Sequence, residues 1–404
     1  MSVDRNADDG GTPGAAVPRL EGVRAAPTGW VRTAAEVSQL AATLAGAPLV
    51  AVDTEADSLH HYPGKLCLVQ IADAEGRAWL VDPLAADLSA LAPVFADPAT
   101  VKVLHAADND LAYLKRLYGF AVAGLFDTAV AARCLGATAL GLDELLRTRL
   151  GVDPGKSRQK DDWSRRPLTA EQEEYAANDV LHLMPLRERL MDELRASGRA
   201  EWAAEECAAL AALPVPDRPQ DPDAYLKLKG TKDLDGRGLA VLRELHRLRE
   251  RLALELDRPP FMILGHDTLV LLAARQPRTE EELLAIPGVT TKVTRRLGAA
   301  ALDAIAYGAA AAEADWPVRP RSARPNVPGA VRRRADTLRA WRTDAAKRVG
   351  LDPGFLLPQR LIDRLAADPP ADRAALEAVE GMRRWRVELS GDEILQMLAA
   401  PKGR

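Results

Sequence analysis

The sequence predicts an α/β domain in the first half of the chain and a helical second half. Two apolar runs, at residues 48–52 and 101–105, predict buried strands. An amphipathic stretch follows the second run, and a long helical pattern begins near Thr169. Beyond residue 212 a proline-rich stretch leads into short helical patterns. This order favours a mixed sheet flanked by helices, followed by small all-α units.

The first predicted strand ends in two acids. Asp53 and Glu55 follow the apolar run that begins at Pro48, and residues two apart on a strand point to the same side. A buried strand tolerates two carboxylates on one side poorly unless a cation compensates their charge. The alternative is that the strand stops at Asp53 and that both acids are solvated.

The second predicted strand is also followed by acids. Asp108, Asn109 and Asp110 open the amphipathic stretch DLAYLKRLYG. Asp108 is predicted to cap this helix, and a carboxylate at Asp110 in the first turn favours the helix dipole. Capping explains one of these acids and hardly requires both.

A further acid lies on the long helix predicted to begin near Thr169. The stretch TAEQ that starts there is typical of a capping box. Tyr175 and Asp179 are four residues apart and therefore lie on one face of the helix. Taken alone, Tyr175 fits a half-buried core aromatic residue and Asp179 a solvated acid.

The four acids together predict more than each acid does alone. Four carboxylates from three separate segments, Asp53, Glu55, Asp110 and Asp179, can hold two divalent metal ions. Paired ions of this kind hydrolyse phosphodiesters. Because the ligands are all oxygen atoms, they suit Mg²⁺ or Mn²⁺ and argue against a structural zinc site.

Three segments together resemble ribonuclease D, a DEDD-type 3′-to-5′ exonuclease with a tyrosine in its third motif. The segments are VAVDTEADSLHHYPGKLCLVQIA, VLHAADNDLAYL and GKSRQKDDWSRRPLTAEQEEYAANDVLHLMPL. They are similar to the three exonuclease motifs of that family, and the resemblance covers roughly residues 30–210. It implies a ribonuclease-H-like exonuclease domain that releases nucleoside 5′-monophosphates from the 3′ end of RNA.

The resemblance also implies a role for each site residue. Asp53, Glu55 and Asp179 would hold one metal ion. Asp53 would bridge to a second ion, and Asp110 would bind that ion directly or through water. Tyr175 would orient the attacking water, because a phenol with an ordinary pKa of about 10 is a weak base at neutral pH.

Other polar residues near the motifs are weaker candidates. The family register places the metal ligand at Asp110 and leaves Asp108 outside the site. His105 and Lys160 are candidate substrate contacts, with a satisfied structural histidine as the alternative for His105. Gln70 interrupts an apolar strand pattern, so we expect it to form hydrogen bonds if it is buried.

The second half of the chain resembles the HRDC domain, a small helical module named for helicases and ribonuclease D. The stretch DRPPFMILGHDTLVLLA followed by LLAIPGV carries this resemblance, and a weaker copy begins at TLRAWRTDAAKRVG. The predicted organisation is a disordered lead-in over residues 1–29, an exonuclease domain over 30–212, a linker over 213–224, an HRDC domain over 225–312, a basic linker over 313–330 and a second, HRDC-like domain over 331–404.

The charge and composition of the chain limit the classes of partner that we expect. The formal net charge of −4 gives no global attraction to polyanions, yet residues 319–348 contain ten basic and two acidic residues. This basic run predicts either phosphate contacts or a solvated, arginine-rich linker. No apolar stretch reaches the length of a membrane span, and the first residues lack the pattern of a secretory signal. We therefore expect a cytoplasmic enzyme without a membrane partner.

The function predicted from these features is a metal-dependent 3′-to-5′ exoribonuclease. The resemblance alone implies RNA as the partner and tRNA precursors as the substrate, whereas protein partners are not predicted. Two alternatives stay open at this point, a DNA 3′-to-5′ exonuclease and a noncatalytic RNA-binding protein. The chain has no GxxxxGK[ST] loop of a helicase or other ATPase.

Overall fold

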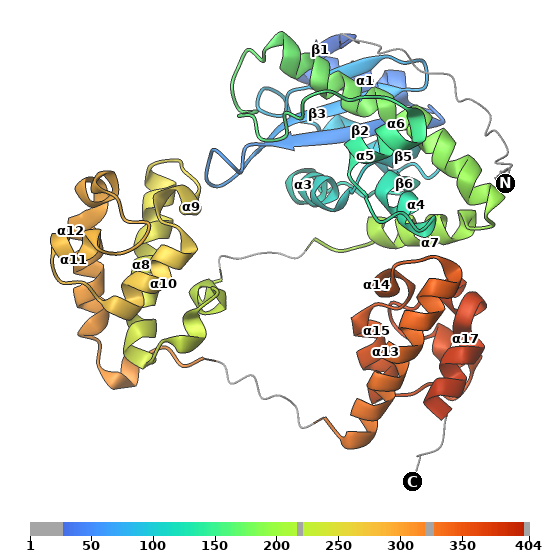
Figure 1. The fold of residues 1–404 in the computed structure, drawn as a ribbon. Helices are drawn as coiled ribbons and strands as arrows, with labels where there is room; N and C mark the ends of the chain where they lie inside the picture. Colours follow the sequence, from blue (N-terminus) through green and yellow to red (C-terminus); the bar gives the residue numbers. More distant parts are fainter. Residues whose placement is uncertain (1–26, 216–220, 320–326, 400–404) are drawn as a thin grey trace, which may run out of the picture.

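A computed structural model describes residues 27–215, 221–319 and 327–399. Figure 1 shows an α/β domain and two separate groups of helices. The disordered lead-in predicted for residues 1–29 lies almost wholly outside the described residues. Parts of the two predicted linkers, residues 216–220 and 320–326, lie outside them as well.

The α/β domain is built on a six-stranded mixed sheet with the order β1-β4-β3-β2-β5-β6. The strand β2 pairs antiparallel with β3 and parallel with β5, so it lies inside the sheet. The strands are β1 (Gly29–Val31), β2 (Leu49–Ala56), β3 (Leu66–Asp73), β4 (Ala78–Val81), β5 (Val101–Leu104) and β6 (Leu125–Asp127).

Helices cover both faces of this sheet. They are α1 (Ala34–Leu44), α2 (Ala92–Ala96), α3 (Asp108–Tyr118), α4 (Thr128–Cys134), α5 (Leu142–Leu145), α6 (Ala170–Ala196) and α7 (Ala200–Ala211). The long helix α6 packs across β2, β3, β4 and β5. Ala51 faces the core beneath α6, whereas Val50 and Val52 face the core beneath α1. Since Asp53 and Glu55 alternate with Val52, they point to the same side as Ala51, towards α6.

Two local predictions have clear outcomes. The strand β2 continues through Asp53 and Glu55 to Ala56, so the alternative that it stops at Asp53 is wrong. The predicted capping box at Thr169 is confirmed, because its hydroxyl accepts from Gln172 N–H and the Gln172 side chain accepts from Thr169 N–H.

The predicted cap at Asp108 is wrong. Asp108 is the first residue of α3, and Ala107 precedes it without a side-chain cap. The buried carboxylate of Asp127, at the end of β6, instead accepts from the backbone N–H groups of Ala106 at 3.2 Å and Ala107 at 2.8 Å. An acid from a neighbouring strand therefore holds the backbone just before α3, and Asp108 lies inside the helix instead of capping it.

The helical half consists of two modules with the same order of helices. The first helical module contains α8 (Gly236–Glu255), α9 (Pro260–Ile263), α10 (His266–Arg275), α11 (Glu280–Leu284) and α12 (Thr291–Ala309). The second helical module contains α13 (Gly329–Val349), α14 (Pro353–Leu356), α15 (Gln359–Ala367), α16 (Arg373–Glu377) and α17 (Arg384–Ala399). In both modules two long helices enclose three shorter ones, of four, nine or ten, and five residues. The repeat predicted from the sequence is present in the fold.

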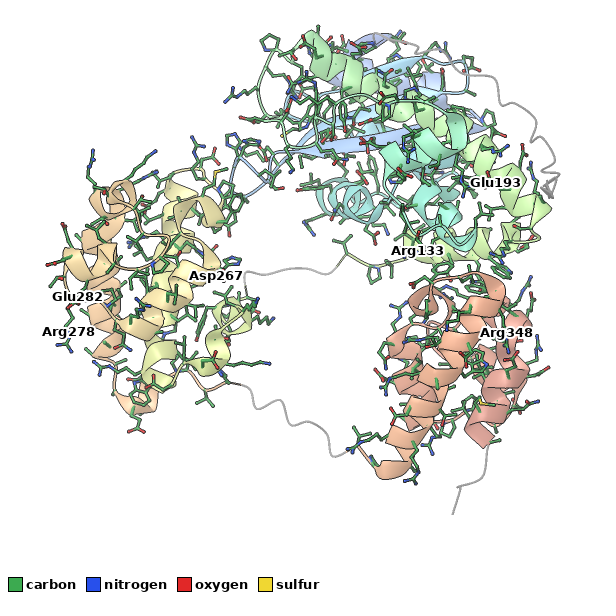
Figure 2. All side chains as sticks on the ribbon, viewed as in Figure 1. Arg133, Glu193, Asp267, Arg278, Glu282 and Arg348 are labelled. Carbon is green, nitrogen blue, oxygen red and sulfur yellow. The ribbon has the colours of Figure 1, made fainter. Side chains whose placement is uncertain are left out.

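The second module packs directly against the α/β domain. Trp385 stacks on Trp202 of α7 with ring centroids 4.7 Å apart. The guanidinium of Arg386 pairs with the carboxylate of Glu206 and also donates to two carbonyl groups of the α14 segment. Arg133 lies at the same boundary, with its guanidinium 5.8 Å from the ring centre of Phe355 (Figure 2).

Several arginines of the basic run are held inside the second module. Arg334 donates to Ala366 O, Arg342 donates to Leu357 O, and Arg348 pairs with Glu393. Arg339 pairs with Asp336. These contacts reduce the number of cations that are free for phosphate groups, and the RNA contact of the run stays a prediction.

No helix within the described parts of the chain is both long enough and apolar enough to cross a bilayer.

Candidate active site

Three elements bring the predicted acids to one place. Asp53 and Glu55 come from β2, Asp179 comes from α6, and Asp110 comes from the first turn of α3. One carboxylate oxygen each from Asp53, Glu55 and Asp179 lie within 4.8 Å of one another. Asp110 accepts a short hydrogen bond from the hydroxyl of Thr54, the residue between the two acids of β2.

The acids line a cavity of about 600 Å³. Its wall is formed by Asp53, Thr54, Glu55, Ala56, Ser58, His105, Ala106, Asn109, Asp110, Tyr113, Gly141, Leu142, Asp143, Gln159, Tyr175 and Asp179. None of the described residues in this wall is a lysine or an arginine. The negative charge of the cavity therefore has no basic side chain to balance it.

Burial raises the pKa of all four acids, and repulsion by other acids of the set adds to it for Asp53 and Glu55. Burial is the larger cause for Glu55, whose pKa rises to about 9, and repulsion by Asp179 and Asp110 adds to it. The pKa of Asp53 is raised well above its usual value, first by burial and then by Asp110. Burial raises the pKa of Asp179 to about 7 and that of Asp110 to about 6.

This electrostatic balance fits a divalent cation. Four carboxylates in a buried site cannot all ionise at neutral pH without a compensating positive charge. Carboxylate oxygens that converge to within 4.8 Å of one another, as those of Asp53, Glu55 and Asp179 do, suit hard cations such as Mg²⁺ and Mn²⁺. The donor set therefore fits the predicted metal ions.

Tyr175 lies beside the acids. Burial, followed by the charge of Asp179, raises the pKa of its phenol far above the ordinary value. A hydrogen bond from Tyr175 lowers the pKa of Asp179 against the effect of burial. The Tyr175 ring packs 6.1 Å from the ring centre of the fully buried Trp163. The hydroxyl is therefore protonated at neutral pH and can donate a hydrogen bond.

The two candidate substrate contacts differ in position. His105 lines the cavity, and its Nδ1 lies 2.8 Å from the hydroxyl of Thr128. Burial lowers the pKa of His105, so its ring is neutral at neutral pH. Lys160 is exposed, and its carbonyl lies 2.8 Å from Nε2 of His60. The neighbouring Gln159 lies in the cavity wall, whereas Lys160 does not.

The expectation that a buried Gln70 forms hydrogen bonds is wrong. Gln70 is fully buried, and neither its amide nitrogen nor its side-chain oxygen has a hydrogen-bond partner among the described residues. It is the cross-strand partner of Asp53, so both side chains point to the same face of the sheet. The unpaired amide thus lies next to the acids.

Sequence reasoning missed Asp143, a further acid in the cavity wall. It lies in the first turn of α5, and its charge raises the pKa of both Asp179 and His105. Its segment, GLDELL, lies outside the three motifs. No spacing signal distinguishes this acid from an ordinary residue in the first turn of a helix.

Comparison with known proteins assigns a family to this arrangement. Residues 28–195 match the family of 3′-5′ exonucleases, and residues 238–305 and 332–398 each match the HRDC domain. The chain is 34% identical over 377 residues to ribonuclease D of Pseudomonas paraeruginosa, which covers 91% of this chain and 97% of that protein. The chain belongs to the ribonuclease D family. Ribonuclease D of Acidiphilium cryptum is 33% identical over 374 residues, covering 91% of this chain and 92% of that protein.

Solved structures agree with the ribonuclease D assignment. The structure of Escherichia coli RNase D, described as an exoribonuclease involved in structured RNA processing, has a TM-score of 0.66 and 27% identity. The match covers 91% of this chain and 98% of that one. A protein from Bifidobacterium adolescentis shares the fold with a TM-score of 0.75 at 24% identity, covering 92% of this chain and 97% of that one.

Membership of the ribonuclease D family decides between the alternatives left open by the sequence. The protein is a 3′-to-5′ exoribonuclease that uses divalent metal ions, and its substrate is RNA. Neither a DNA exonuclease nor a noncatalytic RNA-binding protein fits this assignment as well.

Proposed function

We propose that this exoribonuclease trims the 3′ ends of structured RNA precursors, tRNA precursors above all, with two Mg²⁺ or Mn²⁺ ions. The observation that supports two ions is the set of four acids with raised pKa values around one cavity. The likeness to an enzyme of structured RNA processing supports the class of substrate.

Each acid has a proposed role. Asp53, Glu55 and Asp179 would hold one ion, and Asp53 and Asp110 would hold the second. Bound ions would supply positive charge to polarise the reacting phosphate and to neutralise the charge that develops on it. The fixed acids provide this binding site before the substrate arrives, because β2 packs in one core cluster with α6 and in a second one with α3. His105 lines the wall where the terminal nucleotide would enter.

Tyr175 is proposed to orient the attacking water. Because its pKa is raised, its hydroxyl stays protonated and acts through hydrogen bonding rather than as a base. Tyr175→Phe is expected to lower kcat by about tenfold to a hundredfold, since a water that is poorly placed reacts more slowly. Single-turnover kinetics on a short RNA will measure this effect.

A matched tyrosine gives the control for this substitution. Tyr113 lines the same cavity and has no proposed role in catalysis, so Tyr113→Phe should leave kcat nearly unchanged. The stabilisation of Tyr175→Phe by Mg²⁺ should equal that of the unsubstituted chain. Unchanged turnover in Tyr175→Phe would contradict the water-orienting role.

The raised pKa values predict a linkage between pH, metal and stability. A carboxyl group whose pKa rises on folding contributes stability below its unfolded pKa, and this contribution is lost as pH rises through the folded pKa. For Glu55 this window runs from the ordinary value of 4.5 to about 9. We therefore expect the metal-free protein to lose stability across this range.

Mg²⁺ should reverse this trend, because ions bind the deprotonated carboxylates and their affinity rises with pH. Differential scanning fluorimetry should show a larger increase in Tm with Mg²⁺ at about pH 8.5 than at about pH 6. Asp53→Asn should reduce the difference between the two pH values. An increase in Tm that is equal at both would argue against the four acids as ligands.

Three matched substrates test the proposed RNA. They are a tRNA precursor with a 3′ trailer, the same trailer as free single-stranded RNA, and its DNA counterpart, each incubated with Mg²⁺ or Mn²⁺. We expect 5′-monophosphates from both RNAs, with trimming of the precursor to a stop near the mature end. A precursor that is never shortened, beside rapid digestion of the free trailer, would refute the role in tRNA maturation.

The domain boundaries at residues 30–212, 225–312 and 331–404 are part of this proposal. Core clusters whose buried residues lie within each region support them. A cytoplasmic location is proposed too, supported by three buried, unpaired cysteines, which fit a reducing compartment. Limited proteolysis with mass spectrometry should find its first cuts between these regions.

A further inference from the structure

The loop between β2 and β3, residues 57–65, leads directly from the acid-bearing strand to the first helical module (Figure 1). Ser58 of this loop lines the acid cavity. The buried Asp57 holds the base of the loop by accepting from Lys65 N–H at 2.6 Å. At Gly64 a Cβ atom would lie 2.6 Å from Cβ of Ser58, so the tight base requires glycine.

The tip of the loop contacts the first helical module at two points. Asp257, just beyond the end of α8, lies 2.7 Å from Nδ1 of His61 and accepts from Tyr62 N–H at 3.1 Å. The hydroxyl of Tyr62 donates to Glu250 of α8 at 2.7 Å. The Tyr62 ring also packs against the hydrophobic core of the module. The side chain of Tyr62 and the two contacts of the Asp257 carboxylate thus join the two domains.

Asp257 occupies a backbone position that favours glycine. Its φ angle is +46°, in the left-handed region, and its N–H closes the end of α8 on Leu254 O at 3.3 Å. Helices commonly end with glycine at such positions, since a Cβ atom is disfavoured there. The carboxylate of Asp257 therefore adds nothing to the turn itself, and its contacts are with the loop.

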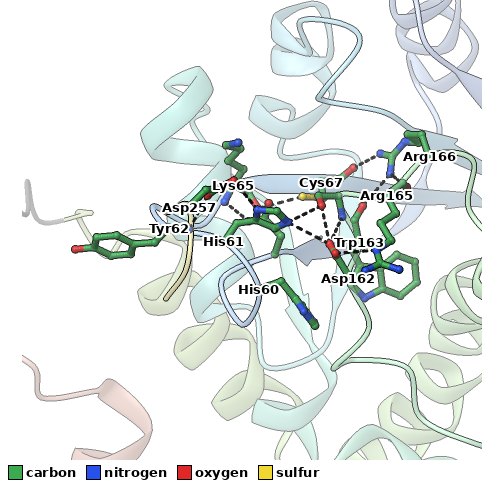
Figure 3. Close-up of polar contacts among 12 residues, drawn as sticks. His60, His61, Tyr62, Lys65, Cys67, Asp162, Trp163, Arg165, Arg166 and Asp257 are labelled. Atoms are coloured by element: carbon green, nitrogen blue, oxygen red, sulfur yellow. Dashed lines mark hydrogen bonds and ion pairs between the residues drawn. The ribbon is translucent and has the colours of Figure 1, made fainter. Parts of the chain in front are cut away.

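The loop is held on its catalytic side as well. Nε2 of His61 lies 3.0 Å from the hydroxyl of Ser164, and Nε2 of His60 lies 2.8 Å from Lys160 O. Figure 3 shows His61 between Asp257 on one side and Asp162 on the other. Residues 160–164 precede α6, which carries Tyr175 and Asp179. The loop is therefore fixed to the active-site domain before it meets the helical module.

We propose that the 57–65 loop is a dock that holds the first helical module beside the acid cavity, with His61 and Asp257 as positioning residues. The dock is expected to affect RNA that extends from the cavity to the module. This proposal rests on the exoribonuclease activity. A module held in place has lost its freedom before RNA binds, so longer RNA binds more tightly. A dinucleotide, which fills only the cavity, gains nothing from the dock.

Asp257→Gly tests the dock without disturbing the turn, because glycine suits the left-handed backbone. The matched control is Gln276→Gly in the same module. Gln276 has a φ angle of +47° at the end of α10 and no part in the dock. We expect Asp257→Gly, but not Gln276→Gly, to increase the radius of gyration in small-angle X-ray scattering.

Kinetics on two substrates test the positioning role of Asp257. Asp257→Gly should raise KM for an RNA of about 30 nucleotides by at least about fivefold, with little change in kcat. Its turnover of a dinucleotide should stay within about twofold of the unsubstituted chain. An unchanged radius of gyration would overturn the dock. An unchanged KM for the long RNA, or a loss of dinucleotide turnover, would overturn the positioning role.

A double-substitution cycle and a binding measurement complete the test. His61→Ala combined with Asp257→Gly should raise KM no further than the stronger single change, because both substitutions remove the same contact between His61 and Asp257. Additive effects on KM would contradict this. Fluorescence anisotropy in an Asp179→Asn background measures how the dock changes the affinity for the long RNA, without interference from hydrolysis. Absence of dinucleotide hydrolysis by the unsubstituted chain would instead refute the exonuclease assignment. Failure of that assignment and failure of the dock proposal therefore give different results.

Discussion

Asp53→Asn and Asp179→Asn are each expected to lower RNA hydrolysis by at least about a thousandfold, while leaving RNA affinity nearly unchanged. Each substitution removes a charged ligand from a group of three oxygens that lie within 4.8 Å of one another. The helices and strands that hold these residues are part of the core, so the neutral amide keeps its place. The measurement is single-turnover release of 5′-monophosphate at saturating Mg²⁺, with RNA binding followed by anisotropy.

The control for this prediction is Asp108→Asn. Asp108 is exposed, lies two residues before Asp110 on α3 and does not line the acid cavity. Its substitution should leave hydrolysis within about twofold, as expected for a surface change away from the reacting groups. If both Asp53→Asn and Asp179→Asn kept full turnover, the proposed metal site would be in the wrong place. Loss in Asp108→Asn with activity in Asp110→Asn would show that the second motif is out of register.

Glu206→Ala is expected to destabilise the contact between the α/β domain and the second module by about 3–5 kcal/mol. The side chain of Arg386 is only 4% exposed, and Glu206 is its carboxylate partner. Truncation of Glu206 leaves a buried guanidinium without its counter-charge, which is the costly case. The same carboxylate accepts from the indole N–H of Trp385 at 2.9 Å, so that donor also loses its partner.

Urea unfolding, followed by the fluorescence of the stacked Trp202 and Trp385, will measure this loss. Glu388→Ala, on the helix α17 that carries Arg386, removes only an exposed pair with Arg384 and should cost less than about 1 kcal/mol. Replacing both Glu206 and Arg386 by apolar residues should restore much of the stability, since no unpaired charge is then buried. Equal midpoints for Glu206→Ala and Glu388→Ala would show that the Arg386 pair contributes little.

The strands and the long helices could be predicted because their signals are local. The apolar run before Asp53 specifies a strand, and the spacing of Tyr175 and Asp179 places both on one helix face, whatever the rest of the chain does. The Thr169 capping box was likewise readable from four consecutive residues. The pairing of these segments into one site came from the resemblance to a family, because no single segment specifies its partners.

The sequence predictions failed where the outcome depended on contacts with distant parts of the chain. Asp127, from another strand, holds the backbone of Ala106 and Ala107 before α3, and the exposed Asp108 is the first residue of the helix and does not cap it. Asp143 enters the cavity wall through a short helix whose sequence has no distinguishing spacing. Gln70 was expected to be satisfied by hydrogen bonds, yet it lies unpaired behind Asp53.

The sequence by itself determined the fold class, the four acids with Tyr175 as candidates, and the repeat of two helical modules. Only the tertiary structure decided which residues join the domains. The contact between His61 and Asp257 spans 196 residues of sequence, and that between Glu206 and Arg386 spans 180. Periodicity and capping reflect interactions within a few residues, whereas such contacts depend on how whole domains pack.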